Sequence, residues 1–243
     1  MAYLFATASS QWLSNTSPVL TAVPITMACW FQRVSTGAAH GLMSLQSGVG
    51  VGDNRFTLAV LATDKLNAVA RSTSSGAAAG ATTITSNVWH HGAGTFTSAT
   101  ARAVFLNGVS DGTNTTSITP AAPTNTEIGR FGSGGNFWDG HIAEAAMWSA
   151  ILDAGEIAAL AKGFSPLLIR PQSLEAYWPL IGRNSPAHDS LGGFPLTLNA
   201  APVASAHPRV FYPQRGKMRR FTTAVAGATI PIFDHHYRMQ RAG

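Results

Sequence analysis

The acidic side chains are the first candidates for chemistry in this chain. A glycoside hydrolase needs two carboxyl groups facing one cleft, and two carboxylates on one strand share a face only at even spacing. The acidic residues closest in sequence are Asp153 with Glu156 and Asp139 with Glu144. The first pair has the spacing of a helix capping box, and the odd separation of the second directs it to opposite faces of a strand. The sequence therefore predicts no enzyme; a glycanase whose carboxylates come from separate strands is the catalytic alternative.

Other catalytic and metal-binding patterns are missing or incomplete. The sequence has no G-x-S-x-G, His-x-x-x-His or G-K-[ST] pattern, so nucleophile-elbow, zincin and P-loop enzymes lack their starting residues. The adjacent pairs His90-His91 and His235-His236 would point to opposite faces of a strand, which disfavours a metal site. Calcium prefers about six to eight oxygen ligands, and the loops at Asp53 and Asp139 supply only some of them. We expect no cofactor, with calcium at Asp53 and Asp139 as the alternative.

Sugar binding is the other chemistry that the residues suggest. It requires an exposed aromatic ring flanked by amide and carboxylate groups, and Trp138, between Asn136 and Asp139 in a Gly-rich loop, fits this description. Trp12 and Trp89 are further candidates. The alternative is that Trp138 closes the end of the core, because a Trp side chain buries a large apolar area.

Short strands and tight turns are the elements that would position these residues. Asn107-Gly108 between apolar runs predicts a type I′ hairpin turn, in which both residues take positive φ. Asp153 and Glu156 predict the capping box of one short helix that ends at Gly163. Strands are predicted at Tyr3–Ala8, Pro24–Phe31, Arg55–Leu61, Leu66–Arg71 and His90–Phe96.

The segment Thr126–Phe164 joins a Gly-rich loop, an alternating strand and the capped helix. In this order it resembles the closing segment of the laminin-G-like, concanavalin-A-type lectins, in which Asp-Gly leads into a G-x-I-x-E-x-x-x-[WY] strand and an E-I-x-A-L helix. The residues that fill this pattern are Asp139, Gly140, Ile142, Glu144, Trp148, Ile151, Leu152, Asp153, Glu156, Ile157 and Leu160. Leu174–Leu180 and Asp189–Leu198 resemble two later strands of the family.

We therefore predict an all-β fold: a two-sheet antiparallel concanavalin-A-like sandwich (jelly roll) with one short helix and a C-terminal extended arm. The resemblance also implies sugar binding and calcium at the rim. Glu144 would be a sandwich-edge carboxylate that accepts backbone or loop hydrogen bonds rather than a catalytic group.

Composition agrees with this class. The 243 residues are 45% hydrophobic and only 11% charged, which suits one large domain of short strands. The single Cys29 can form no internal disulfide, no apolar run is long enough to cross a bilayer, and the N-terminal residues lack the basic segment of a signal peptide. We therefore expect a protein assembled in a reducing cytoplasm, with no membrane partner.

Basic charge is concentrated at the C-terminal end. Residues 1–206 carry nine Lys or Arg against ten Asp or Glu, whereas residues 207–243 carry seven against Asp234 alone. We place the sandwich at 1–206 and a basic, Pro-containing docking arm at 207–243. The arm's apolar segments favour a protein surface over nucleic acid as its partner. The residues predicted to dock are Arg209, Phe211, Tyr212, Arg215, Lys217, Arg219, Arg220, Ile230, Ile232 and Phe233.

A lectin-like sandwich with no catalytic pair and a docking arm resembles a bacteriophage virion component. We expect a non-enzymatic decoration, head-fibre or tail protein, assembled in the host cytoplasm as a homo-oligomer and anchored to capsid or tail proteins through its arm. The displayed sandwich would then contact a host surface glycan. The alternatives are a carbohydrate-binding module of a bacterial protein and, third, a glycoside hydrolase.

Overall fold

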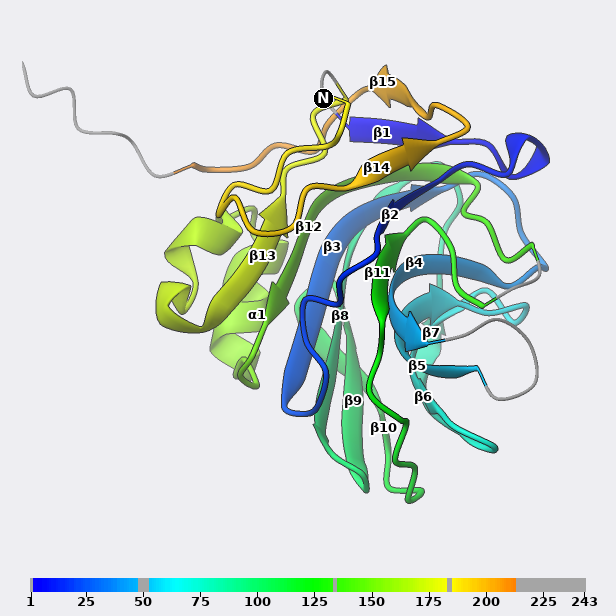
Figure 1. Ribbon diagram of the computed structural model, residues 1–243, viewed down its shortest axis with the longest axis vertical. Coiled ribbons are helices and arrows are strands. Elements are labelled where there is room, and N and C mark those ends of the chain that lie inside the picture. The colour runs from blue at the N-terminus through cyan, green and yellow to red at the C-terminus, as the bar shows by residue number, and fades with distance from the viewer. Residues whose placement is uncertain (1, 48–52, 133–134, 183–184, 213–243) are drawn as a thin grey trace, which may run out of the picture. The chain divides into compact units, whose positions relative to one another are not determined.

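The computed structural model describes residues 2–47, 53–132, 135–182 and 185–212, and two antiparallel sheets packed face to face dominate it (Figure 1). Sheet A contains, in spatial order, β10 (Val109–Asn114), β9 (Ala101–Leu106), β8 (Trp89–Ser98), β3 (Ile25–Arg33), β12 (Gly140–Trp148), β1 (Ala2–Phe5) and β15 (Val203–Ser205), with β13 (Leu174–Trp178) paired to β12. Sheet B contains β14 (Thr197–Asn199), β2 (Trp12–Asn15), β11 (Asn125–Ile128), β4 (His40–Ser47), β5 (Asn54–Val60), β6 (Lys65–Arg71) and β7 (Ser75–Thr83). The predicted all-β sandwich is confirmed.

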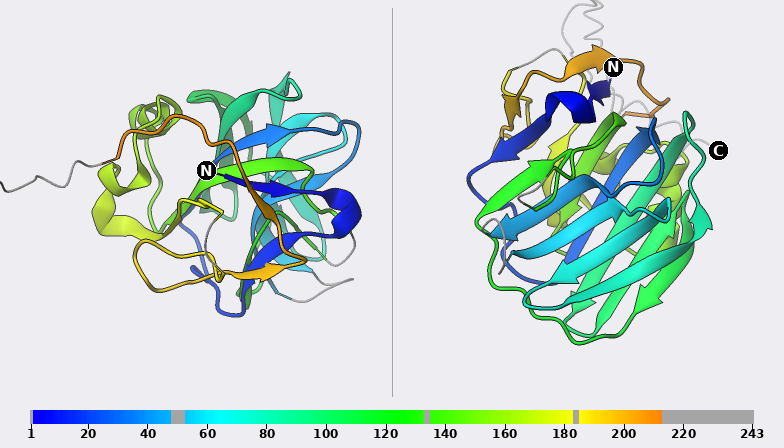
Figure 2. Two further views of the ribbon diagram at one scale, coloured as in Figure 1. Left: turned by 90° about the horizontal axis from the view of Figure 1, so that it is seen from above. Right: turned by 90° about the vertical axis from the view of Figure 1, so that its right-hand side faces the viewer.

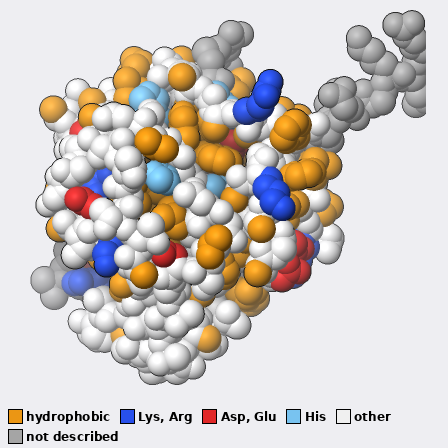
Figure 3. Space-filling view, turned by 180° about the vertical axis from the view of Figure 1, so that it is seen from behind, with side chains coloured by type: hydrophobic (Ala, Val, Ile, Leu, Met, Phe, Trp, Pro, Cys, Tyr) orange, Lys and Arg blue, Asp and Glu red, His pale blue; other side chains and the backbone are white. Residues whose placement is uncertain are grey.

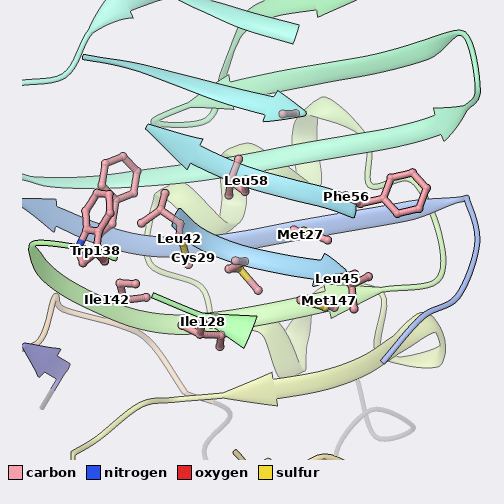
Figure 4. Packing of buried hydrophobic residues seen from close by; sticks show 14 of the residues in the cluster. Met27, Cys29, Leu42, Leu45, Phe56, Leu58, Ile128, Trp138, Ile142 and Met147 are labelled. Carbon is pink, nitrogen blue, oxygen red and sulfur yellow. The ribbon is translucent and has the colours of Figure 1, made fainter. Parts of the chain in front are cut away.

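The core lies between the two sheets because alternate residues of each strand point inward. Met27, Cys29 and Phe31 of β3 are fully buried and meet inward-facing side chains of sheet B such as Leu58. Figure 4 shows this packing from close by. The apolar run at Pro24–Phe31 is thus a central strand of sheet A, as the sequence predicts.

One α-helix, α1 (Ala154–Ala161), covers part of the outer face of sheet A. Asp153 accepts a hydrogen bond from the backbone N–H of Glu156, and Glu156 accepts one from the backbone N–H of Asp153, so the predicted capping box is present. Ile157 and Leu160 bury their side chains in a second cluster with Ala146 and Trp148 of β12. Short 3₁₀ helices occur at η1 (Thr7–Ser9), η2 (Pro166–Leu168) and η3 (Pro171–Ser173).

The predicted hairpin joins β9 to β10. Asn107 and Gly108 have φ values of 51° and 83°, and the Asn107 side chain accepts a hydrogen bond from the His91 backbone N–H at 2.9 Å. A Cβ atom on Gly108 would lie 2.9 Å from the Cα of Ala158. The turn therefore contacts α1 as well as connecting two strands.

The predicted boundary at residue 206/207 is wrong, because residues 207–212 pack against the sandwich. The backbone N–H of Phe211 donates to Gly163 O at 2.6 Å, and the Ser165 N–H donates to Phe211 O at 3.0 Å. The compact unit runs over Met1–Pro213, and a second unit covers Gln214–Gly243, outside the described residues. The segment docks on its own chain through these backbone hydrogen bonds and the Tyr212 hydroxyl, which donates to Glu144 at 2.6 Å.

Candidate functional site

A row of polar side chains crosses the outer face of sheet B, one from each of four neighbouring strands. Asn125 of β11 pairs with Gln46 of β4, Gln46 with Arg55 of β5, and Arg55 with Arg71 of β6. Directly paired residues on one face of a sheet have Cβ atoms about 4.5–5.5 Å apart. We call Asn125, Gln46, Arg55 and Arg71 the polar row; Figure 2 (right) looks toward the sheet that carries it.

The Gly-rich loop after β11 folds back over the middle of the polar row. The Gly132 N–H donates to Gln46 Oε1 at 2.9 Å, and the Arg55 guanidinium lies over the Phe131 ring, 4.9 Å from its centroid. These contacts bury Gln46 and Arg55, which are 1% and 8% exposed. Arg71, at the open end of the row, remains partly exposed. A ligand would therefore reach the row from the Arg71 end.

Arg55 and Arg71 place two positive charges opposite each other on adjacent strands. Burial and then the charge of Arg71 lower the pKa of Arg55 to about 10. Asp53 forms an ion pair with Arg55 and neutralises one of the two charges. Within the described part of the chain, Arg71 forms no ion pair, and the Nε atoms of Arg55 and Arg71 and Oδ1 of Asp53 have no hydrogen-bond partner. The row thus has an excess positive charge and unused polar atoms.

An aromatic group adjoins this face. The Arg130 guanidinium stacks on the Trp12 ring at 4.2 Å, and the Phe137 ring lies 5.6 Å from that of Trp12. Glu127 holds Arg130 through two hydrogen bonds, of 2.8 and 2.5 Å. Trp12 and Phe137 are partly exposed. We call Trp12, Arg130 and Phe137 the aromatic corner.

The predicted sugar-stacking role of Trp138 is wrong, because the ring is fully buried. Trp138 lies at one end of the core beside Leu42 and Ile142 (Figure 4). Its ring meets Phe31 edge to face at 5.6 Å. The alternative, that Trp138 closes the core, is what the structure shows. Asn136 and Asp139 are partly buried, and their backbone carbonyls accept hydrogen bonds from Gly41 and Val34.

The two calcium candidates have different surroundings. Asp53 is 5% exposed and paired with Arg55, so a cation there would have to displace a guanidinium. Asp139 belongs to the loop before β12. No group of three His, Cys, Asp or Glu side chains suited to a metal occurs in the described residues. Calcium binding stays a prediction.

Glu144 is buried on the outer face of sheet A, at the centre of the sheet rather than at its edge. A bulge in β12 between Ala143 and Ala146 gives Glu144 a φ of 54°, and such bulges re-aim side chains. Glu144 accepts hydrogen bonds from the hydroxyls of Tyr177 at 2.5 Å and Tyr212 at 2.6 Å, and His207 Nε2 lies 2.9 Å from Oε1. Both carboxylate oxygens are therefore engaged. The predicted loop hydrogen bonds are present, since Tyr212 and His207 belong to the irregular segment after β15, whereas the predicted position at the sheet edge is wrong.

The two tyrosines keep their protons. Burial, followed by the nearby Glu144 charge, raises the pKa of both Tyr177 and Tyr212. A neighbouring carboxylate, Asp189, is also fully engaged, because it accepts from four backbone N–H groups between Tyr177 and Phe194. Glu144 and its partners thus have a structural explanation: they fasten the segment that ends at Tyr212.

Three of the predicted docking residues lie in the described chain. Arg209 is exposed, Phe211 pairs with Phe164, and Tyr212 binds Glu144. Phe164 and Phe211 remain 44% and 56% exposed, and Figure 3 shows hydrophobic side chains gathered on this side of the molecule. The other predicted docking residues lie outside the described residues: Arg215, Lys217, Arg219, Arg220, Ile230, Ile232 and Phe233.

No helix in the described ranges is long and apolar enough to cross a membrane.

The fold and motifs agree with a known family. The family model for the concanavalin A-like lectin/glucanase superfamily, of the laminin-G type, matches residues 7–158. The chain belongs to this superfamily. A search of curated proteins found no match.

Solved structures similar to this superfamily member include carbohydrate-binding proteins. A proposed carbohydrate-binding protein from Bacteroides ovatus is 18% identical, with a TM-score of 0.64 over 84% of this chain and 61% of that one. The CBM40 of a Ruminococcus gnavus sialidase, bound to α2,3-sialyllactose, is 17% identical, with a TM-score of 0.50 over 58% of this chain and 84% of that one. Domain 4 of a Geobacillus stearothermophilus arabinanase, in complex with arabinotriose, is 15% identical, with a TM-score of 0.50 over 60% and 70%. At these identities the likeness concerns the fold.

The polar row was missed at the sequence level although its signal is present. Arg55 and Arg71 stand at the outer ends of two strands that we predicted as neighbours in the chain. A tight connection between them pairs those two ends, which brings the guanidinium groups together. Gln46 and Asn125 could not be placed, because their strands were not predicted. Trp12 was a sugar-binding candidate, and it lies in the aromatic corner.

Proposed function

We propose that the protein is a non-enzymatic carbohydrate-binding module that holds a glycan on the outer face of sheet B. The observation that carries the proposal is the polar row beside the aromatic corner. Sugar recognition combines a stacking ring with several fixed hydrogen-bonding groups. This face offers the rings of Trp12 and Phe137 on the β2 side of the sheet, Asn125 on the neighbouring β11 and Arg71 on β6. The membership of the lectin and glucanase superfamily supports the same function.

Binding without turnover is favoured over hydrolysis by how the carboxylates are used. On the outer face of sheet B, Glu127 is bound by Arg130 and Asp53 by Arg55. A glycosidase needs two carboxyl groups that face one cleft and are free to contact the substrate. This face therefore has the groups to hold a sugar, and its two carboxylates are committed to arginines.

The proposal is tested by calorimetric titration of the full-length protein with a panel of soluble oligosaccharides. Trp12→Ala and Arg71→Gln should each weaken binding at least tenfold, since both side chains are partly exposed on the proposed face. Arg209→Gln, an exposed arginine outside sheet B, is the matched control and should bind as the unaltered protein does. Release of reducing sugar by the unaltered protein would contradict the non-enzymatic part of the proposal.

Placement in a bacteriophage virion, a capsid or tail partner and a homo-oligomer remain predictions from the sequence. The described residues carry no observation that favours them over the carbohydrate-binding module, which was our first alternative. Co-sedimentation of the protein with particles from its native source would test them.

A further inference from the structure

The opposed arginines of the polar row indicate the class of glycan. Arg55 and Arg71 are directly paired on one face of sheet B, and like charges in that position destabilise a sheet. Asp53 is the one acidic side chain that pairs with either of them among the described residues. The site therefore retains the equivalent of one uncompensated positive charge. Local arrangements that cost stability without a structural gain are expected where a ligand binds.

The unused donor atoms point the same way. Arg55 is more than nine-tenths buried, yet its Nε–H has no acceptor within the described ranges, and the Arg71 Nε–H likewise has none. A buried donor without an acceptor destabilises the protein, and a charged donor does so more strongly than a neutral one. A planar anion that accepts from the guanidinium groups would satisfy these donors and neutralise the excess charge.

We propose that the glycan carries a carboxylate, as in a uronic or sialic acid residue, and that Arg71 together with Arg55 binds it. This inference rests on the proposed function of the same face. A guanidinium presents paired N–H groups in a plane that matches a carboxylate, so two bonds form at once. The neutral part of the sugar would extend outward from the Arg71 end of the row, because the loop covers Gln46 and Arg55, and the single excess charge matches one carboxylate.

The experiment compares acidic glycans with neutral counterparts of the same size on the full-length protein. Tetragalacturonate is titrated against its methyl ester, and sialyllactose against lactose, with sulfated lactose as a second anion. We expect at least one acidic glycan to bind tenfold or more tightly than its neutral counterpart and than the sulfated sugar. Whichever acidic glycan binds more tightly identifies the source of the carboxylate.

Variants of Arg71 assign the effect to the polar row. Arg71→Gln should abolish the preference for the acid, and Arg71→Lys should keep the charge but lose most of the preference, because an ammonium has no fork. Arg209→Gln should leave it unchanged. Equal binding of acidic and neutral glycans, or tighter binding of the sulfated sugar, overturns the carboxylate while leaving the proposed function intact. If no glycan on either panel binds, both proposals fail.

Discussion

The two tyrosines that bind Glu144 should contribute unequally to stability. Tyr177 is 1% exposed and Tyr212 is 44% exposed, although both hydroxyls donate to the same carboxylate at 2.5 and 2.6 Å. A hydrogen bond to a charged group is worth about 1.5–3 kcal/mol. Water cannot reach the place of a deleted Tyr177 hydroxyl, so Tyr177→Phe should cost about 2–3 kcal/mol. Water can take the place of the Tyr212 hydroxyl, so Tyr212→Phe should cost about 1 kcal/mol or less.

Truncation extends this prediction to the corrected domain boundary. The comparison is between a chain that ends at Tyr212 and one that ends at Ala206. A chain that ends at Ala206 loses three hydrogen bonds, that of Tyr212 and the two backbone bonds of Phe211 with Gly163 and Ser165, besides the contact of His207 with Glu144. At about 1 kcal/mol for each bond, the loss is roughly 3 kcal/mol.

Urea denaturation followed by Trp fluorescence measures all four proteins. The two substitutions are isosteric, so they remove a hydroxyl and leave the ring packing in place. The reasoning is refuted if Tyr212→Phe costs as much as Tyr177→Phe, or if the chain ending at Ala206 is as stable as the one ending at Tyr212.

Further predictions concern acid stability and the hairpin. Burial lowers the pKa of His91 to about 3 in the folded protein, whereas its pKa in the unfolded chain is about 6.5. The neutral His91 therefore contributes fully to stability above pH 6.5. As the pH falls from 6.5 toward 3, the unfolding free energy decreases by about 1.4 kcal/mol per pH unit. His91→Gln should flatten the fall in unfolding free energy between pH 7 and pH 5, and a slope equal to that of the unaltered protein would contradict this. Gly108→Val should cost about 3 kcal/mol by urea denaturation, because positive φ strain adds to the contact with Ala158. Gly37→Ala is the control, because Gly37 has a φ of 75° but no atom lies within 4 Å of the added Cβ. It should cost only about 1 kcal/mol. A cost equal to that of Gly108→Val would contradict the role of the contact between residue 108 and Ala158.

Local rules predicted the elements whose residues decide their own conformation. Asn107-Gly108 selects its turn through positive φ, and Asp153 with Glu156 caps α1 through bonds within four residues. The central strand β3 was predictable because burial on both faces leaves a continuous apolar run. In each case the residues that determine the conformation lie close together in the sequence.

Other elements depend on contacts that the sequence does not display. β7, Ser75–Thr83, is built from Ala, Gly, Ser and Thr, and lacks the apolar β-branched pattern of a typical strand. The edge of sheet B meets that of sheet A there and leaves little room for side chains. A Cβ on Gly80 of β7 would collide with the Asp111 carboxylate of β10, and a Cβ on Gly112 of β10 would collide with the carbonyl of Ala79. The bulge that turns Glu144 outward likewise depends on pairing between β12 and β3.

The sequence indicated the loop that adjoins the candidate site but not the residues of the polar row. The sequence directed attention to the Gly-rich loop and to Trp138, but a Trp in such a loop can close the core as readily as it can stack on a sugar. Only tertiary structure shows that Trp138 is buried and that Phe131 and Gly132 of the same loop contact the polar row. The opposed charges of Arg55 and Arg71 follow from strand register.

The most direct test of glycan binding on sheet B follows the indole N–H resonances of the protein by ¹H–¹⁵N NMR during titration with an acidic oligosaccharide. Trp12 belongs to the aromatic corner of sheet B, whereas Trp30 lies on the outer face of sheet A beside His91. The account predicts that the Trp12 resonance shifts with the ligand and that the Trp30 resonance does not. A shift of Trp30 with an unmoved Trp12 would place the glycan on the other sheet and contradict the account.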